Sequence, residues 1–345
     1  MELNFNIVYT VGTVRYLRLL VFSLLKWSEA SFRLVANGCS PQEAHMLEEL
    51  CRSSSQLEFL ALPSTTLLPH SDVLSHLQSM EQSQYFCFMD SDILATGDFV
   101  SEMAPYLGQY SAVFSATPIW CTEEEQVLPD ILPRMPGHFN RTSDGVCLGS
   151  TYFAIYDKRV LSELIESTGI GFGRYAWDEI PASCQAQINQ IGLRKLHYDT
   201  GKLLNVVLNA QGKQLKYVDS AFLRHIGGVS ARAALERGLN PRGRSRTRAP
   251  WPVVRIKRWF ARAARIEAGG REKIEATEAE RREYFARRRR RWPAARYFSE
   301  LFAALFDDRP LPPVPKIGDR QIEGRIEAVG REVAALYGEF GERLR

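Results

Sequence analysis

Apolar and polar positions in the first 90 residues alternate between two patterns. Residues 14–29 and 70–80 repeat their apolar side chains at helical spacing. Short apolar runs that end at turn residues are typical of buried strands, and four occur here: residues 5–11, 32–36, 57–62 and 85–89. A strand–helix order that repeats in this way predicts a parallel, doubly wound α/β sheet.

A further helix is predicted to begin just after Ser40. Ser40 has the side chain of an N-cap, Pro41 takes the first helical position, and Glu43 completes a capping box three residues after the cap. Beyond the fourth strand the pattern becomes mixed. The expected elements there are a helix at 158–168 and strands at 112–116, 150–156 and 215–222.

Composition divides the chain into three parts. Residues 1–235 hold the strand–helix pattern, residues 236–252 form a basic linker with Pro and Gly, and residues 253–345 are helical in composition and rich in arginine. A break at 307–315 interrupts the last part, and an amphipathic helix is expected to resume at 319–344. The net charge is +4, but the first part is acidic and the remainder is basic, which indicates different surroundings for the two.

The composition is that of a globular protein, with 45% hydrophobic and 24% charged residues among 345. The six cysteines are scattered without a CxxC pair, which argues against a zinc site or a disulfide framework. No apolar run is long enough to span a bilayer, and the first residues do not resemble a signal peptide. We therefore expect a cytoplasmic protein with reduced cysteines.

The most informative segment is the strand at 85–89, which runs directly into Asp90-Ser91-Asp92. A buried parallel strand delivers the residues that follow it to the carboxyl edge of the sheet, where open α/β sheets bind ligands. Two carboxylates one residue apart at that edge are suited to a divalent cation and the phosphates attached to it. The alternative is that Asp90 and Asp92 only cap the next element.

The order of these elements, with Asn37-Gly38 after the second strand and Asp-x-Asp after the fourth, resembles the GT-A nucleotide-sugar glycosyltransferases of the family 2-like group. The resemblance covers residues 5–230. It implies a GT-A fold, a mostly parallel mixed sheet with helices on both faces, followed here by an α-helical C-terminal extension. It also implies a nucleoside-diphosphate sugar as donor, a hydroxyl group as acceptor, and Mn²⁺ or Mg²⁺ as cofactor.

By the same resemblance, Asp92 is a metal ligand and Asp90 contacts both the metal and the donor, next to Ser91. His225, followed by Ile226-Gly227-Gly228, matches the histidine that completes the metal site in several GT-A families. Imidazole is an acceptable ligand for Mn²⁺, and glycines allow the backbone to approach phosphate. A histidine that is only hydrogen-bonded to backbone at a strand end is the alternative.

A transferase that inverts the sugar linkage needs a carboxylate base for the acceptor hydroxyl. The resemblance places an acidic pair after a glycine-rich loop, where this chain has Asp178 and Glu179, and Asp178 is the preferred base. Two acids that stabilise a helix N-terminus are the alternative.

The donor nucleoside is expected at the ends of the first two strands. The candidates are Tyr9, Thr10 and Val11 on the first strand and Asn37 on the second. Many relatives carry an aspartate where this chain has Ala36, so the identity of the base is left open. His70 at the start of a helix could also meet the donor, although a structural role there is the alternative.

Five consecutive arginines, residues 287–291, lie among aromatic residues in the C-terminal part. Arginines mixed with aromatics suit an anionic surface, so residues 253–306 are a candidate for contact with a membrane and the protein for a peripheral position there. A solvated helix face with glutamate partners is the alternative. Nucleic acid is the least favoured partner, because no known reading module is present.

Two further functions remain open from the sequence. A phosphatase of the haloacid-dehalogenase type also follows a strand with Asp-x-Asp, in which case Asp90 would be the nucleophile. That family places its motif after the first strand, and has Thr or Val where this chain has Leu94. A non-catalytic GT-A-like scaffold that binds a surface through its basic part is the third possibility.

Overall fold

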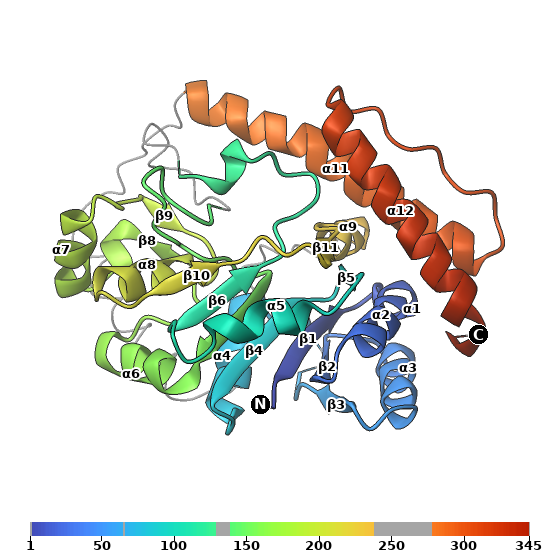
Figure 1. The fold of residues 1–345 in the computed structure, drawn as a ribbon, viewed down its shortest axis with the longest axis horizontal. Coiled ribbons are helices and arrows are strands. Elements are labelled where there is room, and N and C mark those ends of the chain that lie inside the picture. Colours follow the sequence, from blue (N-terminus) through green and yellow to red (C-terminus); the bar gives the residue numbers. More distant parts are fainter. Residues whose placement is uncertain (1, 65, 129–138, 238–277, 345) are drawn as a thin grey trace.

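A computed structural model describes residues 2–64, 66–128, 139–237 and 278–344 (Figure 1). Its centre is a seven-stranded sheet with the order β10-β6-β7-β4-β1-β2-β3. The strands are β1 (Asn4–Thr10), β2 (Ser31–Asn37), β3 (Leu57–Ala61), β4 (Tyr85–Asp90), β6 (Ala112–Ser115), β7 (Phe153–Asp157) and β10 (Leu215–Tyr217). The four strands predicted for the first 90 residues therefore occur, with no boundary shifted by more than one residue.

Strand directions make the sheet mixed but mostly parallel. β1 pairs in parallel with both β2 and β4, β2 pairs in parallel with β3, and β10 pairs in parallel with β6. β7 runs antiparallel between β4 and β6. This confirms the predicted α/β class. The register aligns Val8 with Asp90 and Thr10 with Asn37, so the carboxyl ends of β1, β2 and β4 form one edge.

Helices cover both faces of the sheet, and two hydrophobic cores result. Side chains alternate along β1: Phe5, Ile7 and Tyr9 enter one core, and Val8 enters the other. The first core includes α1 (Val14–Leu17), α2 (Leu19–Trp27) and α3 (Pro41–Arg52). The second core includes α4 (His70–Met80), α6 (Lys158–Thr168), α7 (Ala182–Gln190) and α8 (Lys202–Ala210).

Sequence signals located most of these helices. The Ser40 side chain accepts a hydrogen bond from the Glu43 backbone and the Glu43 side chain caps the Ser40 backbone, which confirms the predicted capping box. The helix predicted at 14–29 is in fact two helices that meet at Arg18. α7, α8 and the short α5 (Phe99–Met103) were not predicted.

Two small antiparallel pairs complete the strands. β5 (Ile93–Ala95) pairs with β11 (Leu223–His225), and β8 (Tyr175–Ala176) pairs with β9 (His197–Tyr198). The strand predicted at 215–222 was wrong in its extent, because β10 ends at Tyr217 and the chain turns before β11 begins. Through β11, a segment far along the chain returns to the residues that directly follow Asp92.

The C-terminal helices join the first core. α9 (Val229–Glu236), α11 (Glu278–Phe306) and α12 (Arg320–Phe340) follow β11, and Figure 1 shows α11 and α12 side by side above α2. Phe298 and Phe302 of α11 and Ile326 of α12 are fully buried with Phe5 and Leu20 in one cluster. The described part of the predicted extension therefore shares its core with the sheet.

The break predicted at 307–315 does separate α11 from α12. Residues 238–252 of the predicted linker, and residues 253–277 of the part proposed to meet a membrane, lie outside the described residues. No helix in the described ranges combines the length and apolar character that crossing a bilayer requires.

Candidate metal and donor site

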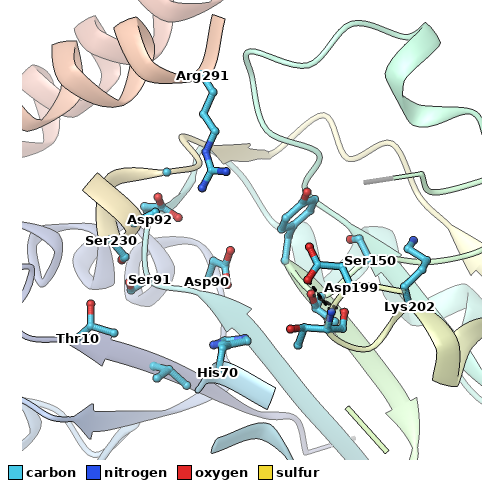
Figure 2. Close-up of a pocket in the computed structure, with 16 residues that line it drawn as sticks. Thr10, His70, Asp90, Ser91, Asp92, Ser150, Asp199, Lys202, Ser230 and Arg291 are labelled. Atoms are coloured by element: carbon cyan, nitrogen blue, oxygen red, sulfur yellow. Dashed lines mark hydrogen bonds between the residues drawn. The ribbon is translucent and has the colours of Figure 1, made fainter. Parts of the chain in front are cut away.

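A cavity of about 290 Å³ opens at the carboxyl ends of β1 and β4 (Figure 2). Its size is near the lower end of typical ligand sites, roughly 300–1,000 Å³. Its polar lining comes from segments far apart in the sequence and includes Thr10, His70, Asp90, Ser91, Asp92, Ser150, Asp199, Lys202, Ser230 and Arg291. The predicted edge of the sheet is thus where the cavity lies.

Asp92 and Asp90 have different environments at this edge. Asp92 is 4% exposed, its carboxylate accepts a hydrogen bond from the Val229 backbone at 3.2 Å, and its backbone carbonyl accepts one from Ile226 at 2.9 Å. Asp90 is the last residue of β4, and its side chain is 30% exposed. Asp92 is therefore fixed against α9, whereas Asp90 is open to the cavity.

His225 completes a cluster with the two aspartates. Its Nδ1 lies 2.8 Å from the carbonyl oxygen of Ala116. Because a carbonyl only accepts, Nδ1 carries the proton there. The other ring nitrogen, Nε2, lies 3.4 Å from Oδ2 of Asp90 and 3.2 Å from Oδ1 of Asp92, and makes no hydrogen bond within the described residues. A lone pair beside two carboxylates is unfavourable unless a proton or a cation lies between them.

Charge within this cluster shifts two pKa values. Burial of the His225 ring opposes its charge, but interaction with the nearby carboxylates of Asp90 and Asp92 outweighs burial and raises its pKa to about 10. Burial also opposes the charge of Asp92, yet His225 lowers the pKa of that carboxyl overall. One oxygen from each aspartate and Nε2 of His225 all lie within 4.8 Å of one another, which fits a divalent cation.

The backbone that holds His225 is strained. Ala116, whose carbonyl fixes the tautomer of His225, has a φ of 63°, a value that is rare for a residue other than glycine. Strain of this kind persists where the surroundings hold it, and it concentrates at functional sites. The orientation of Nε2 toward the aspartates is therefore enforced by the fold.

The opposite wall of the cavity carries Asp199, Ser150 and Lys202 (Figure 2). Asp199 pairs with Nε of Arg174 at 2.9 Å. Lys202 donates to the carbonyl oxygens of Phe139 and Gly149, and burial lowers its pKa to about 7. Asp199 and Lys202 were not predicted from the sequence, although Asp199 precedes Thr200, Gly201 and an apolar helical run, which together form a recognisable helix start.

Residues predicted for the donor nucleoside occupy three environments. Thr10 lines the cavity, and Val11 lines a second, more open cavity of about 520 Å³ beside Gly38 and Ser40. The Tyr9 side chain is 1% exposed in the core and does not reach either cavity. The Asn37 amide exchanges two hydrogen bonds with the backbone of Leu68, at 3.0 and 2.9 Å.

Asp178 and Glu179 lie apart from the cavity. They form a 3₁₀ turn between β8 and α7, both side chains are exposed, and neither lines the cavity of Asp90 and Asp92. Glu179 accepts a hydrogen bond from the Ala176 backbone at 2.9 Å, which is the capping role considered for this pair. A catalytic role for either residue stays a prediction.

The five arginines of residues 287–291 lie in three different environments. Arg287 and Arg290 face inward to Glu125, at 3.4 and 2.6 Å, and all three side chains are at most 17% exposed. Arg291 lines the cavity, whereas Arg288 and Arg289 are exposed. Contact with a membrane stays a prediction.

Comparison with known proteins gave matches to solved structures but none by sequence. No family model matches the chain, and no curated protein matches its sequence. The galactosyltransferase LgtC, in complex with donor and acceptor sugar analogues, is 12% identical with a TM-score of 0.36, over 63% of this chain and 73% of that one.

Two further matches are glycosyltransferases as well. TarS residues 1–349 of S. aureus, with UDP-GlcNAc, is 15% identical with a TM-score of 0.38, over 65% of this chain and 58% of that one. The mannosyltransferase PcManGT of Pyrobaculum calidifontis, with GDP-Man and Mn²⁺, is 11% identical with a TM-score of 0.42, over 96% of this chain and 80% of that one. At such scores, the role of this site has to be derived from its own residues.

Proposed function

We propose that this protein transfers a sugar from a nucleoside-diphosphate sugar to a hydroxyl group and that it depends on a divalent cation. The observation that carries the proposal is the cluster of Asp90, Asp92 and His225 at the carboxyl edge of β4, beside a cavity with polar walls. The sharing of one histidine by both aspartates fits a set of metal ligands. This arrangement of one histidine between two aspartates does not favour the phosphatase alternative, in which Asp90 would act as a nucleophile.

The ligand set favours Mn²⁺ over Mg²⁺. Mg²⁺ prefers oxygen ligands, whereas Mn²⁺ also accepts an imidazole nitrogen such as Nε2 of His225. The bound cation would neutralise the charge that grows on the departing diphosphate. Asp92, held by the Val229 and Ile226 backbone, would keep the cation in place, and the more open Asp90 would also reach the donor.

The remaining walls suggest how the donor lies. Thr10 and Ser91 line the first cavity, and Val11, the residue after Thr10, lines the second. We propose that the second cavity holds the nucleoside of the donor. The transferred sugar would then lie between Asp90 and the wall of Ser150 and Asp199 (Figure 2). We propose Asp199 as the carboxylate that faces the sugar or the acceptor hydroxyl, since among the described residues it is the cavity carboxylate outside the metal cluster.

A pair of variants decides between Asp199 and the acid predicted from the sequence. Asp199→Asn should lower kcat by about 100-fold, the usual contribution of a general acid or base, with donor affinity preserved. Asp178→Asn should change kcat by less than about twofold, because this exposed side chain lies outside the cavity. The reverse result would assign the role to Asp178.

The function itself is tested by turnover of sugar nucleotides. A panel of UDP- and GDP-linked hexoses and N-acetylhexosamines covers the donors seen with the TarS and PcManGT structures. The measurement is release of the nucleoside diphosphate with Mn²⁺, with Mg²⁺ and with a chelator, in the presence of simple sugar acceptors. We expect metal-dependent release from one nucleotide class, and equal release in the presence of chelator would contradict the proposal.

A further inference from the structure

The geometry points to Arg291 of α11 as a phosphate-binding residue of the donor site, so that the C-terminal helices complete a site begun by the sheet. This inference rests on the proposed function and names the ligand class as the diphosphate group of the donor. Arg291 lies about 200 residues after Asp92 in the chain, yet both line the same cavity. Figure 2 shows its guanidinium directed from the helix toward Asp92 and Asp90.

Aromatic rings hold the Arg291 side chain in this direction. Its guanidinium carbon lies 5.8 Å from the centre of the Trp120 ring and 5.5 Å from that of Trp292, both within the range of cation–π attraction. Trp120 is buried, and its indole nitrogen donates to the Gly227 carbonyl at 2.9 Å. Trp120 therefore links Arg291 to the turn that directly follows the metal ligand His225.

The position of α11 is fixed one turn before Arg291. Glu125 is 8% exposed and binds both Arg287 and Arg290. The Thr122 backbone donates to the other oxygen of Glu125 at 2.7 Å, which orients the carboxylate. From α12, Arg325 donates to the Cys121 carbonyl at 2.9 Å. Residues 120–125, which we call the anchor loop, thus bind both C-terminal helices.

Gly228 provides the space that Arg291 needs. Its φ is +104°, and a Cβ at this position would lie 3.1 Å from Nε of Arg291. Directly after it, α9 begins, and Ser230 in its first turn also lines the cavity. A helix N-terminus and a guanidinium on one side of a metal cluster create a positive field that favours an anion.

The chemistry of this wall selects phosphate. A guanidinium is planar and donates two parallel hydrogen bonds, which matches the oxygens of a phosphate group. A diphosphate that reaches the cluster of Asp90, Asp92 and His225 through a cation has further oxygens on the side away from the metal. Figure 2 shows Arg291 reaching toward the cluster from α11, and the start of α9 lies directly beside Asp92.

The test measures two affinities on the full chain: that of Mn²⁺ alone, by electron paramagnetic resonance, and that of the nucleoside diphosphate with Mn²⁺, by calorimetry. In Arg291→Met we expect the nucleoside diphosphate to bind about 10- to 100-fold more weakly, the usual loss for hydrogen bonds to a charged group. Mn²⁺ alone should bind as tightly as before or more tightly. Arg291→Lys keeps the charge without the paired donors and should give an intermediate loss.

The matched control is Arg289→Met, an exposed arginine of the same helix, which should leave both affinities unchanged. Unchanged nucleotide affinity in Arg291→Met would overturn the inference while the proposed function stands. A loss of Mn²⁺ affinity equal to the loss of nucleotide affinity would also overturn it, since the substitution would then have damaged the cluster itself. If the wild-type protein with Mn²⁺ binds no nucleoside diphosphate, the proposed function fails, and the inference with it.

Discussion

Two walls of the same cavity are built in different ways. The sheet wall, formed by Asp90, Asp92 and His225, lies at the ends of β4 and β11, and backbone groups of Ala116 and Val229 bond directly to its ligand side chains. The helix wall, formed by Arg291, is fixed from a distance by Glu125 and Trp120 on the anchor loop. The first wall concentrates negative charge, and the second brings positive charge to it.

This difference suggests a division of labour. A metal site needs ligand atoms at fixed separations, which rigid strands supply best. A phosphate contact tolerates more adjustment, and a long arginine side chain on a helix can supply it. We therefore expect damage to the sheet wall to abolish metal dependence, and damage to the helix wall to weaken nucleotide binding and stability while leaving the metal cluster intact.

The largest expected effect belongs to Asp92→Asn. Loss of this buried carboxylate removes a metal ligand and should lower turnover of the sugar nucleotide by about 10²- to 10³-fold, the usual cost of one preorganised group that stabilises transition-state charge. Mn²⁺ affinity and kcat are the measurements. Asp72→Asn, an exposed acid on α4, is the control, and wild-type turnover by Asp92→Asn would contradict the role of the sheet wall.

Glu125→Gln tests the helix wall through its anchor. Removing this charge leaves two largely buried guanidinium groups without their carboxylate, which should lower the free energy of unfolding by about 2–3 kcal/mol. Nucleotide affinity should fall as well, because Arg291 follows Arg290 on the same helix. Thermal unfolding and calorimetry measure the two effects. The exposed neighbour Glu124, changed to Gln, should show neither, and a stable variant with normal nucleotide affinity would show that α11 needs no anchor.

Gly228→Ala sharpens the comparison with a smaller change. A positive φ disfavours alanine by about 1 kcal/mol, and the new methyl group would also displace Arg291. Gly212→Ala is the matched control, since Gly212 has a φ of +74° and nothing near its missing Cβ. Both variants should lose similar stability, but Gly228→Ala alone should weaken nucleotide binding. Equal nucleotide affinity in the two variants would show that Arg291 does not depend on this space.

Local sequence patterns predicted the sheet wall but not the helix wall. Asp-x-Asp after an apolar strand and His225 before two glycines are readable because each ligand lies within a local sequence pattern, although the groups that orient Asp92 and His225 are distant in the chain. Arg291 looked like one member of a basic run, because its direction depends on Trp120 and Glu125, which are more than 160 residues away. Asp199 was missed because the strand before it, β9, spans two residues and gives no apolar run that would place Asp199 at the edge of a sheet.

The most direct test of the account is thermal unfolding of the wild-type protein with nucleoside diphosphates and their sugars, each with and without Mn²⁺. A ligand at one hundred times its dissociation constant adds about 2.7 kcal/mol to the free energy of unfolding. The account predicts a rise in Tm for one nucleotide class that requires Mn²⁺ and is absent in Asp92→Asn. A rise that is independent of Mn²⁺, or no rise with any nucleotide, would contradict it.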